Sequence, residues 1–197
     1  MAPVRHSLMD QQWCFTKEDL LATPSARDGM AAAEERELRA KGVNFIAQVC
    51  AMMHCPPHVM AAAAVFLNRF LMRRSLVNTA QARALHHYQV AATAVYIALK
   101  TEEHYRRTRE LIVACCRVAQ KKADLVVDEQ TKDYWRWRDT IVLNEDVLLE
   151  ALCFDLTLEL PHYPLSDMLA VIGTTIRRAL RPVPKDGKSS QQTASKG

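Results

Sequence analysis

The feature that most constrains this sequence is an unbroken apolar segment, AATAVYIAL, which runs from Ala91 to Leu99 and ends in KTEE. Its apolar side chains would surround a helix axis rather than form a stripe along one side. A helix that is apolar on every side must be enclosed by other helices, and the alanines in this segment would let those helices approach closely. The sequence therefore predicts an all-α globule in which a helix over 82–100 lies at the centre.

The rest of the chain also has helical rather than strand periodicity. It contains only five glycines, and proline-marked breaks separate pieces of helix length with a period near 3.6. We expect a short helix opened by a capping box at Thr16 and Asp19, and ended near Pro24. The long helices are then expected over 30–54, 57–74, 82–100, 108–121 and 131–153, followed by another over 164–180.

These elements suggest an organisation into four parts. An N-terminal extension with the short helix covers 1–25, the main helical domain covers 26–160, and a further helix lies within 161–180. Residues 181–197 are rich in Lys, Ser, Gln, Pro and Gly, which cannot bury enough apolar surface to become ordered, so we expect a disordered tail.

Composition and charge narrow the class of protein. The chain of 197 residues is 49% hydrophobic, without an apolar stretch near the ~18 residues of a membrane span or a recognisable leader. We therefore expect an intracellular protein with no membrane partner. Most of the net charge of +4 falls in the tail, where four basic residues face one acid. The nearly neutral remainder argues against sequence-independent nucleic-acid binding.

One aromatic and basic run, YWRWRDT, could be taken for a single-strand nucleic-acid motif. On a helix, however, Trp135 and Trp137 would point about 200° apart. We expect one of them to lie in the core and the other to be half-exposed.

The cysteines and histidines are the remaining candidates for metal binding or chemistry. Six cysteines could form three disulfides, but four lie in apolar helical patterns typical of buried thiols. In CAMMHCPPH, Cys50 and His54 would share a helix face beside Cys55 and His58, yet this is not a known zinc spacing. Glycine-rich phosphate loops and glycine-flanked nucleophiles are also missing. We expect a binding protein without metal or cofactor rather than an enzyme.

Several charged or polar residues fall on apolar helix rows, where they need a partner. Glu145 shares a row with Ile141 and Leu148, and Lys100 ends the row of Thr93 and Tyr96. Arg39 and Asn68 also have apolar neighbours on their rows. Buried polar groups must be satisfied, so we expect Arg39 and Asn68 to meet each other or Asp155 in a structural role.

The order of four segments resembles the five-helix cyclin box. These segments are ELRAKGVNFIAQV, AAAVFLNRFLM, AATAVYIALKTEEHYRRTRELI and NEDVLLEALCFDLTLELPH. The resemblance covers about residues 10 to 165, and is greatest to cyclins of the transcriptional kinases, the cyclin K, cyclin T and fungal kinase-cyclin group. It implies the cyclin fold, in which the third of five helices is central.

The resemblance also implies a function and a set of site residues. In cyclins, the residues that match Lys100 and Glu145 grip a cyclin-dependent kinase beside its mobile regulatory helix. Ile97, Leu149 and Leu156 match positions of apolar contact, and Thr101 takes a place often held by an aromatic residue in cell-cycle cyclins. The implied protein is a nuclear regulatory subunit without catalysis of its own, whose kinase phosphorylates the RNA polymerase II C-terminal repeat.

Three departures from the family pattern leave alternatives open. Asn68 stands where the usual acidic partner of Arg39 would be, and Lys41 and Gly42 match the substrate-docking patch of cell-cycle cyclins poorly. The sequence after residue 160 is also too short for the second five-helix repeat that family members usually carry. The alternative is a cyclin-fold adaptor similar to general transcription factor IIB, which would bind nucleic acid as well as protein.

Overall fold

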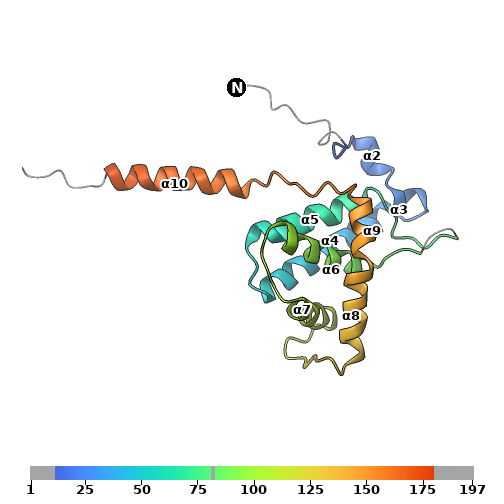
Figure 1. Ribbon diagram of the computed structural model, residues 1–197. Helices are drawn as coiled ribbons and strands as arrows, with labels where there is room; N and C mark the ends of the chain where they lie inside the picture. The colour runs from blue at the N-terminus through green and yellow to red at the C-terminus, as the bar shows by residue number, and fades with distance from the viewer. Residues whose placement is uncertain (1–11, 81–82, 180–197) are drawn as a thin grey trace, which may run out of the picture. The chain divides into compact units, whose positions relative to one another are not determined.

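The computed structural model describes residues 12–80 and 83–179, and in these residues the regular secondary structure is entirely helical (Figure 1). The chain divides into two compact units, Met1–Leu160 and Pro161–Gly197. The helices of the first unit are α2 (Lys17–Leu21), α3 (Pro24–Arg27), α4 (Ala32–Met52), α5 (Pro57–Leu71), α6 (His87–Thr101), α7 (Thr108–Gln120), α8 (Lys132–Leu143) and α9 (Glu145–Ala151). The predicted all-α class is confirmed.

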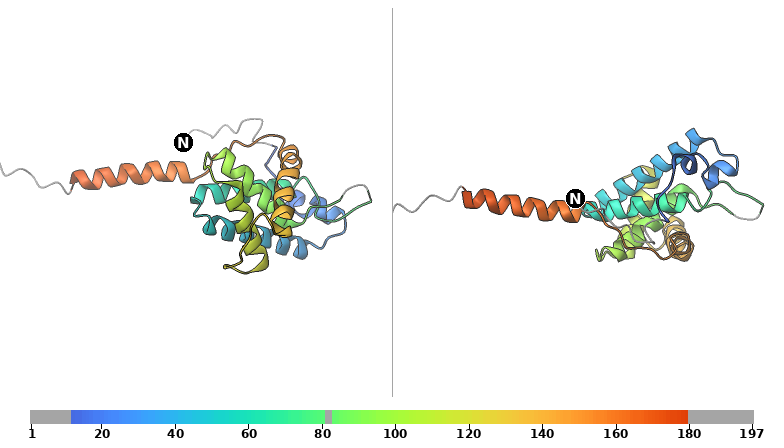
Figure 2. Two further views of the ribbon diagram at one scale, coloured as in Figure 1. Left: turned by 60° about the horizontal axis from the view of Figure 1, so that its bottom comes forward. Right: turned by 90° about the horizontal axis from the view of Figure 1, so that it is seen from above.

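Helix α6 is the centre of the first unit. It packs against each of α4, α5, α7, α8 and α9, and Figure 2 shows the unit that they form from two further sides. Its alanines at 91, 92, 94 and 98 are fully buried, so the neighbouring helices approach its backbone closely. The prediction of an enclosed third helix is therefore confirmed, and the core is built around the segment that was most apolar in the sequence.

Close approach also depends on a glycine in the first long helix. A Cβ atom placed on Gly42 of α4 would lie 2.9 Å from Cδ2 of Leu67 on α5. Leu67 is fully buried, so there is little room for it to move away. Gly42 is thus a packing residue between α4 and α5.

The N-terminal part is more structured than the sequence indicated. Thr16 and Asp19 form the predicted capping box at the start of α2. A second short helix, α3, follows at once, because Thr23 accepts a hydrogen bond from the amide of Ala26 and Pro24 occupies the first helical position. From the sequence, Pro24 was expected only to end the preceding helix, so α3 was not predicted.

The central helix begins later than predicted. His86 is its N-cap, and the backbone amide of His86 donates a hydrogen bond to the side-chain oxygen of Gln89. This capping box sets the start of α6 at His87, after a non-helical segment that includes Ala84 and Leu85.

The predicted fifth helix over 131–153 is wrong as a single element. It is broken at Asn144, whose side-chain amide donates to the carbonyl of Thr140 at 2.6 Å and whose ψ is 2°. Helix α8 ends before Asn144, and α9 begins immediately after it at Glu145. The break places Glu145 in the first turn of a new helix, where the helix dipole favours a carboxylate.

The second unit consists of α10 (His162–Ala179), close to the predicted range of 164–180. Its larger apolar side chains are exposed, among them Leu165, Met168 and Ile172. The tail predicted for 181–197 lies outside the described residues. None of the helices that the structure describes is long and apolar enough to cross a membrane.

Candidate functional site

The most informative polar contact in the first unit joins the end of α6 to the start of α9. Nζ of Lys100 lies 2.5 Å from Oε1 of Glu145, although 45 positions separate the two residues. The Lys100 side chain is 50% exposed and that of Glu145 26% exposed. The ion pair therefore lies at the surface, where both groups can also reach a partner.

The environment of Lys100 keeps its charge. Burial of the ammonium acts to lower the pKa of Lys100. The polar and charge interactions of the ammonium with Glu145 and Tyr96 outweigh this effect, so the pKa is raised. The ammonium also lies over the Tyr96 ring, 4.1 Å from its centroid. Lys100 is a cation held in one place by a carboxylate on one side and an aromatic face on the other.

The apolar residues expected around this pair differ in accessibility. Ile97 is only 2% exposed and belongs to the core of the free protein. Leu149 and Leu156 are half-buried against that core and keep accessible surface. Thr101 is half-buried, and its hydroxyl donates to the carbonyl of Ala98 at 3.3 Å. Two of the four thus offer apolar side-chain surface, while Ile97 supports the surface from beneath.

Sequence reasoning missed one exposed aromatic beside this region. After α9 the backbone of Cys153 and Phe154 is left-handed, with φ values of 53° and 54°. The Phe154 amide donates to the carbonyl of Leu149 at 3.0 Å, which closes the turn. Phe154 is 70% exposed as a result. Left-handed φ values in non-glycine residues are costly and accumulate at functional sites, but nothing in the sequence pattern LCFDL indicated them.

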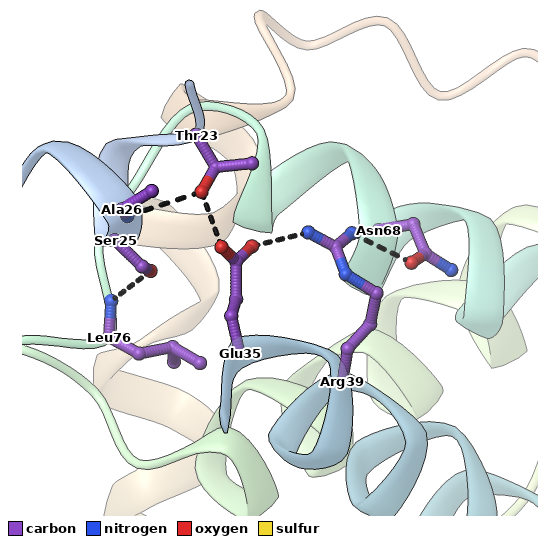
Figure 3. A network of polar contacts seen from close by, with 7 residues as sticks. All are labelled: Thr23, Ser25, Ala26, Glu35, Arg39, Asn68 and Leu76. Carbon is purple, nitrogen blue, oxygen red and sulfur yellow. Dashed lines mark hydrogen bonds and ion pairs between the residues drawn. The ribbon is translucent and has the colours of Figure 1, made fainter. Parts of the chain in front are cut away.

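A separate polar network links the N-terminal segment to α4 and α5, as Figure 3 shows. Arg39 donates to Oε1 of Glu35 at 2.7 Å and to Oδ1 of Asn68 at 3.0 Å. The hydroxyl of Thr23 donates to the other oxygen of Glu35, which is only 4% exposed. The Asn68 amide in turn donates to the carbonyl of Ala64 at 2.7 Å.

This network corrects the expectation for Arg39. Arg39 and Asn68 meet, as expected, but both are half-buried rather than fully interior. The carboxylate that balances Arg39 comes from Glu35, one turn earlier on the same helix. The sequence EERELRA contained this i,i+4 pair, which the sequence analysis overlooked.

Asp155 does not join that network, so this alternative is wrong. Its Oδ2 accepts hydrogen bonds from Nε1 of Trp13 at 2.7 Å and from the side-chain amide nitrogen of Gln12 at 3.1 Å. Arg69 donates to the Asp155 carbonyl at 3.0 Å and lies over the Trp13 ring, 4.5 Å from its centroid. Asp155 is the anchor that holds the segment before α2 against α5.

The cysteines and the CAMMHCPPH segment form neither a disulfide nor a ligand cluster in the described part of the chain. None of the six cysteines, which all lie in the described residues, forms a disulfide, and among the described residues no three His, Cys, Asp or Glu side chains lie in positions to hold a metal ion. Cys50, Cys115 and Cys116 are buried, whereas Cys153 is exposed by the turn after α9. Trp135 is 46% exposed, as expected, whereas Trp137 is half-buried rather than in the core and stacks 5.8 Å from Phe45.

Comparisons with known proteins agree with this architecture. Residues 11–157 match the model of one protein family, whose description is "Cyclin, N-terminal domain". Cyclin pch1 of Schizosaccharomyces pombe is 46% identical over 151 residues, which cover 77% of this chain and 42% of pch1. Human cyclin-T2 is 26% identical over 151 residues, covering 77% of this chain and 20% of that protein. The chain therefore spans less than half the length of these relatives.

The fold is also similar to a chain in the structure of the yeast TFIIK complex (Kin28/Ccl1/Tfb3), with a TM-score of 0.53 and 21% identity. The alignment covers 92% of this chain and 68% of the other. At this identity the likeness concerns the fold alone. Together with the family match over most of the first unit, it leads to one conclusion: this chain belongs to the family of the cyclin N-terminal domain.

Proposed function

We propose that this protein is a cyclin-type regulatory subunit that binds and activates a cyclin-dependent serine/threonine kinase and has no catalytic activity of its own. The family membership and the similarity to pch1 and cyclin-T2 support a cyclin of the transcriptional class. The kinase partner is then one that phosphorylates the C-terminal repeat of RNA polymerase II, and the site of action is the nucleus.

The observation that carries the proposal is the surface ion pair between Lys100 and Glu145. An ammonium can donate to main-chain carbonyls, and a carboxylate can accept from main-chain amides at the start of a helix. Both groups lie at helix ends and both are accessible. Half-buried Leu149 and Leu156 would supply apolar surface next to them. Such a surface suits a partner helix. The two charged groups would bind the main chain at the end of that helix, and the leucines would bury its apolar side chains.

Activation then follows as a population shift. A cyclin that binds the inward position of a kinase regulatory helix better than the outward position increases the inward population. In that position the kinase lysine and glutamate pair around ATP. A tenfold shift requires a difference in binding free energy of about 1.4 kcal/mol between the two positions.

The test is a titration of the purified chain against recombinant kinase catalytic subunits of the transcriptional and the cell-cycle classes. We expect binding to a transcriptional kinase, together with increased phosphorylation of a peptide of polymerase repeats. Failure to bind any catalytic subunit would contradict the proposal. Binding only to cell-cycle kinases would contradict the assignment to transcription.

A further inference from the structure

A cationic cavity lies between the end of α4 and the first turns of α7, and the kinase-binding proposal does not use it. Its volume is about 340 Å³, at the small end of the range for ligand pockets. The floor is apolar, formed by Met52, Met53, Val113 and Ala114, of which Met53 and Ala114 are buried. The polar lining consists of His54, Arg106, Arg109, Glu110 and Arg117. The three arginines and Glu110 together give a formal net charge of +2.

The three guanidinium groups have no anionic partner in the part of the chain that the structure describes. The ion pairs formed there involve neither Arg106, Arg109 nor Arg117. Arg117 is held in place because its Nε donates to the carbonyl of Leu125 at 3.0 Å, and Nε of Arg106 contacts Nε2 of His104 at 3.2 Å. The remaining guanidinium N–H groups are therefore available around one cavity.

The start of α7 is cationic, whereas Arg117 lies in its last turn, where the helix dipole favours a cation. Arg107 is the N-cap of α7 and makes no side-chain cap hydrogen bond, and Arg109 lies in the first turn. The dipole of a helix disfavours cations near its N-terminus. Glu110, in the same first turn, offsets part of this cost. An anion bound in the cavity would offset more of it.

We infer that this cavity binds a phosphorylated threonine or serine side chain of a protein segment. Guanidinium groups donate paired, charge-assisted hydrogen bonds to phosphate oxygens, and the apolar floor suits the aliphatic part of such a side chain. A nucleic-acid strand fits less well, because its binding requires an extended basic face, whereas this cavity is small and includes Glu110.

The position of the cavity links it to the proposed function. Arg106 follows Lys100 by six positions, so their Cα atoms are at most about 21 Å apart. If the chain binds a kinase through Lys100, the cavity would lie within reach of that enzyme's phosphoserine and phosphothreonine products. This last step rests on the proposed function, but the binding of a phosphorylated side chain does not.

The test is fluorescence polarisation of the full chain, without a kinase, against a labelled Ala/Gly peptide that carries one central phosphothreonine. Matching peptides carry threonine or glutamate at that position. The test variant is Arg106→Ala/Arg109→Ala, because both side chains are exposed and the hydrogen bond from Arg106 to nearby His104 is itself exposed. The matched control is Arg36→Ala/Arg136→Ala, which removes two exposed arginines outside the cavity.

We expect the phosphothreonine peptide to bind at least about tenfold more tightly than the other two peptides. The double variant in the cavity should lose about tenfold or more in affinity at an unchanged urea midpoint, and the control should retain binding. Equal binding of the three peptides, or equal loss in both double variants, would overturn the inference. Tighter binding of labelled oligothymidine that is lost in the same variant would also overturn it, in favour of nucleic acid. Because no kinase is present, a failure here is distinct from a failure to bind a kinase.

Discussion

Replacement of Glu35 by alanine should destabilise the protein far more than its position near the start of α4 suggests. Its carboxylate is buried, and it accepts hydrogen bonds from the Arg39 guanidinium and from the Thr23 hydroxyl. Removal of the carboxylate deprives Thr23 and Arg39 of their acceptor. Thr23 is only 3% exposed, and the Arg39 side chain is 24% exposed. Water can reach Arg39 in part, and Asn68 still binds it.

The magnitude follows from these contacts. A hydrogen bond to a charged group contributes about 1.5–3 kcal/mol, and a buried hydroxyl left unsatisfied costs about 1–3 kcal/mol. Allowing for the partial hydration of Arg39, we expect Glu35→Ala to lower the free energy of unfolding by about 3 kcal/mol. With a urea m-value of about 2 kcal/mol/M, the midpoint should fall by about 1.5 M.

The assay is urea unfolding of the purified chain followed by far-UV circular dichroism. The matched control is Glu37→Ala, two positions further along α4, because Glu37 forms an ion pair with Lys41 in which both side chains are largely exposed. The control should leave the midpoint unchanged. If Glu35→Ala shifted the midpoint no more than Glu37→Ala, the network of Figure 3 would not stabilise the fold and our reasoning would be wrong.

Two further predictions concern the core. Burial, with the nearby charges of His86 and Lys41, lowers the pKa of His87 to about 4, and Nε2 of His87 has no hydrogen-bond partner among the described residues. The unfolded chain takes up this proton below pH ~6.5, so stability should be lost as the pH falls from about 6.5 towards 4. Between pH 7 and 5 the wild type should lose about 2 kcal/mol more than His87→Gln in urea unfolding, and parallel pH profiles would contradict this. Gly42→Ala should cost about 1–3 kcal/mol in the same assay because its Cβ would meet buried Leu67. Gly173→Ala, which meets nothing within 4 Å, is the control, and equal effects would refute the packing argument.

The fold could be predicted where one strong pattern dominated. The apolar segment 91–99 required an enclosed helix, and α6 is buried by five neighbours. The boundaries depended on local hydrogen bonds that compete with helical periodicity. The bond from Asn144 to Thr140 splits the fifth helix, and the capping box of His86 and Gln89 delays the third.

The candidate site could be predicted only in part, because distant residues meet through the tertiary fold. The resemblance indicated Lys100 and Glu145, and the structure brings them into contact. Their role in kinase binding stays a prediction. Two further features were not predicted, one despite a signal in the sequence and one without any. The carboxylate of Glu35 was visible as an i,i+4 pair with Arg39, whereas the exposure of Phe154 follows from a left-handed turn.

The central claim is that Lys100 and Glu145 together bind a kinase, and a double-mutant cycle on kinase affinity tests it most directly. A recombinant transcriptional kinase subunit would be titrated with the wild type, the two single variants Lys100→Ala and Glu145→Ala, and the double variant. Lys41→Ala is the control, because it also removes an exposed, ion-paired lysine. Truncation of charged groups buried in an interface costs about 2–5 kcal/mol, so each single variant should bind at least about thirtyfold more weakly. Because the ion pair lies at the surface of the free protein, the free energy of unfolding should change by less than about 1 kcal/mol. A double variant that binds the kinase as tightly as the wild type would contradict the account.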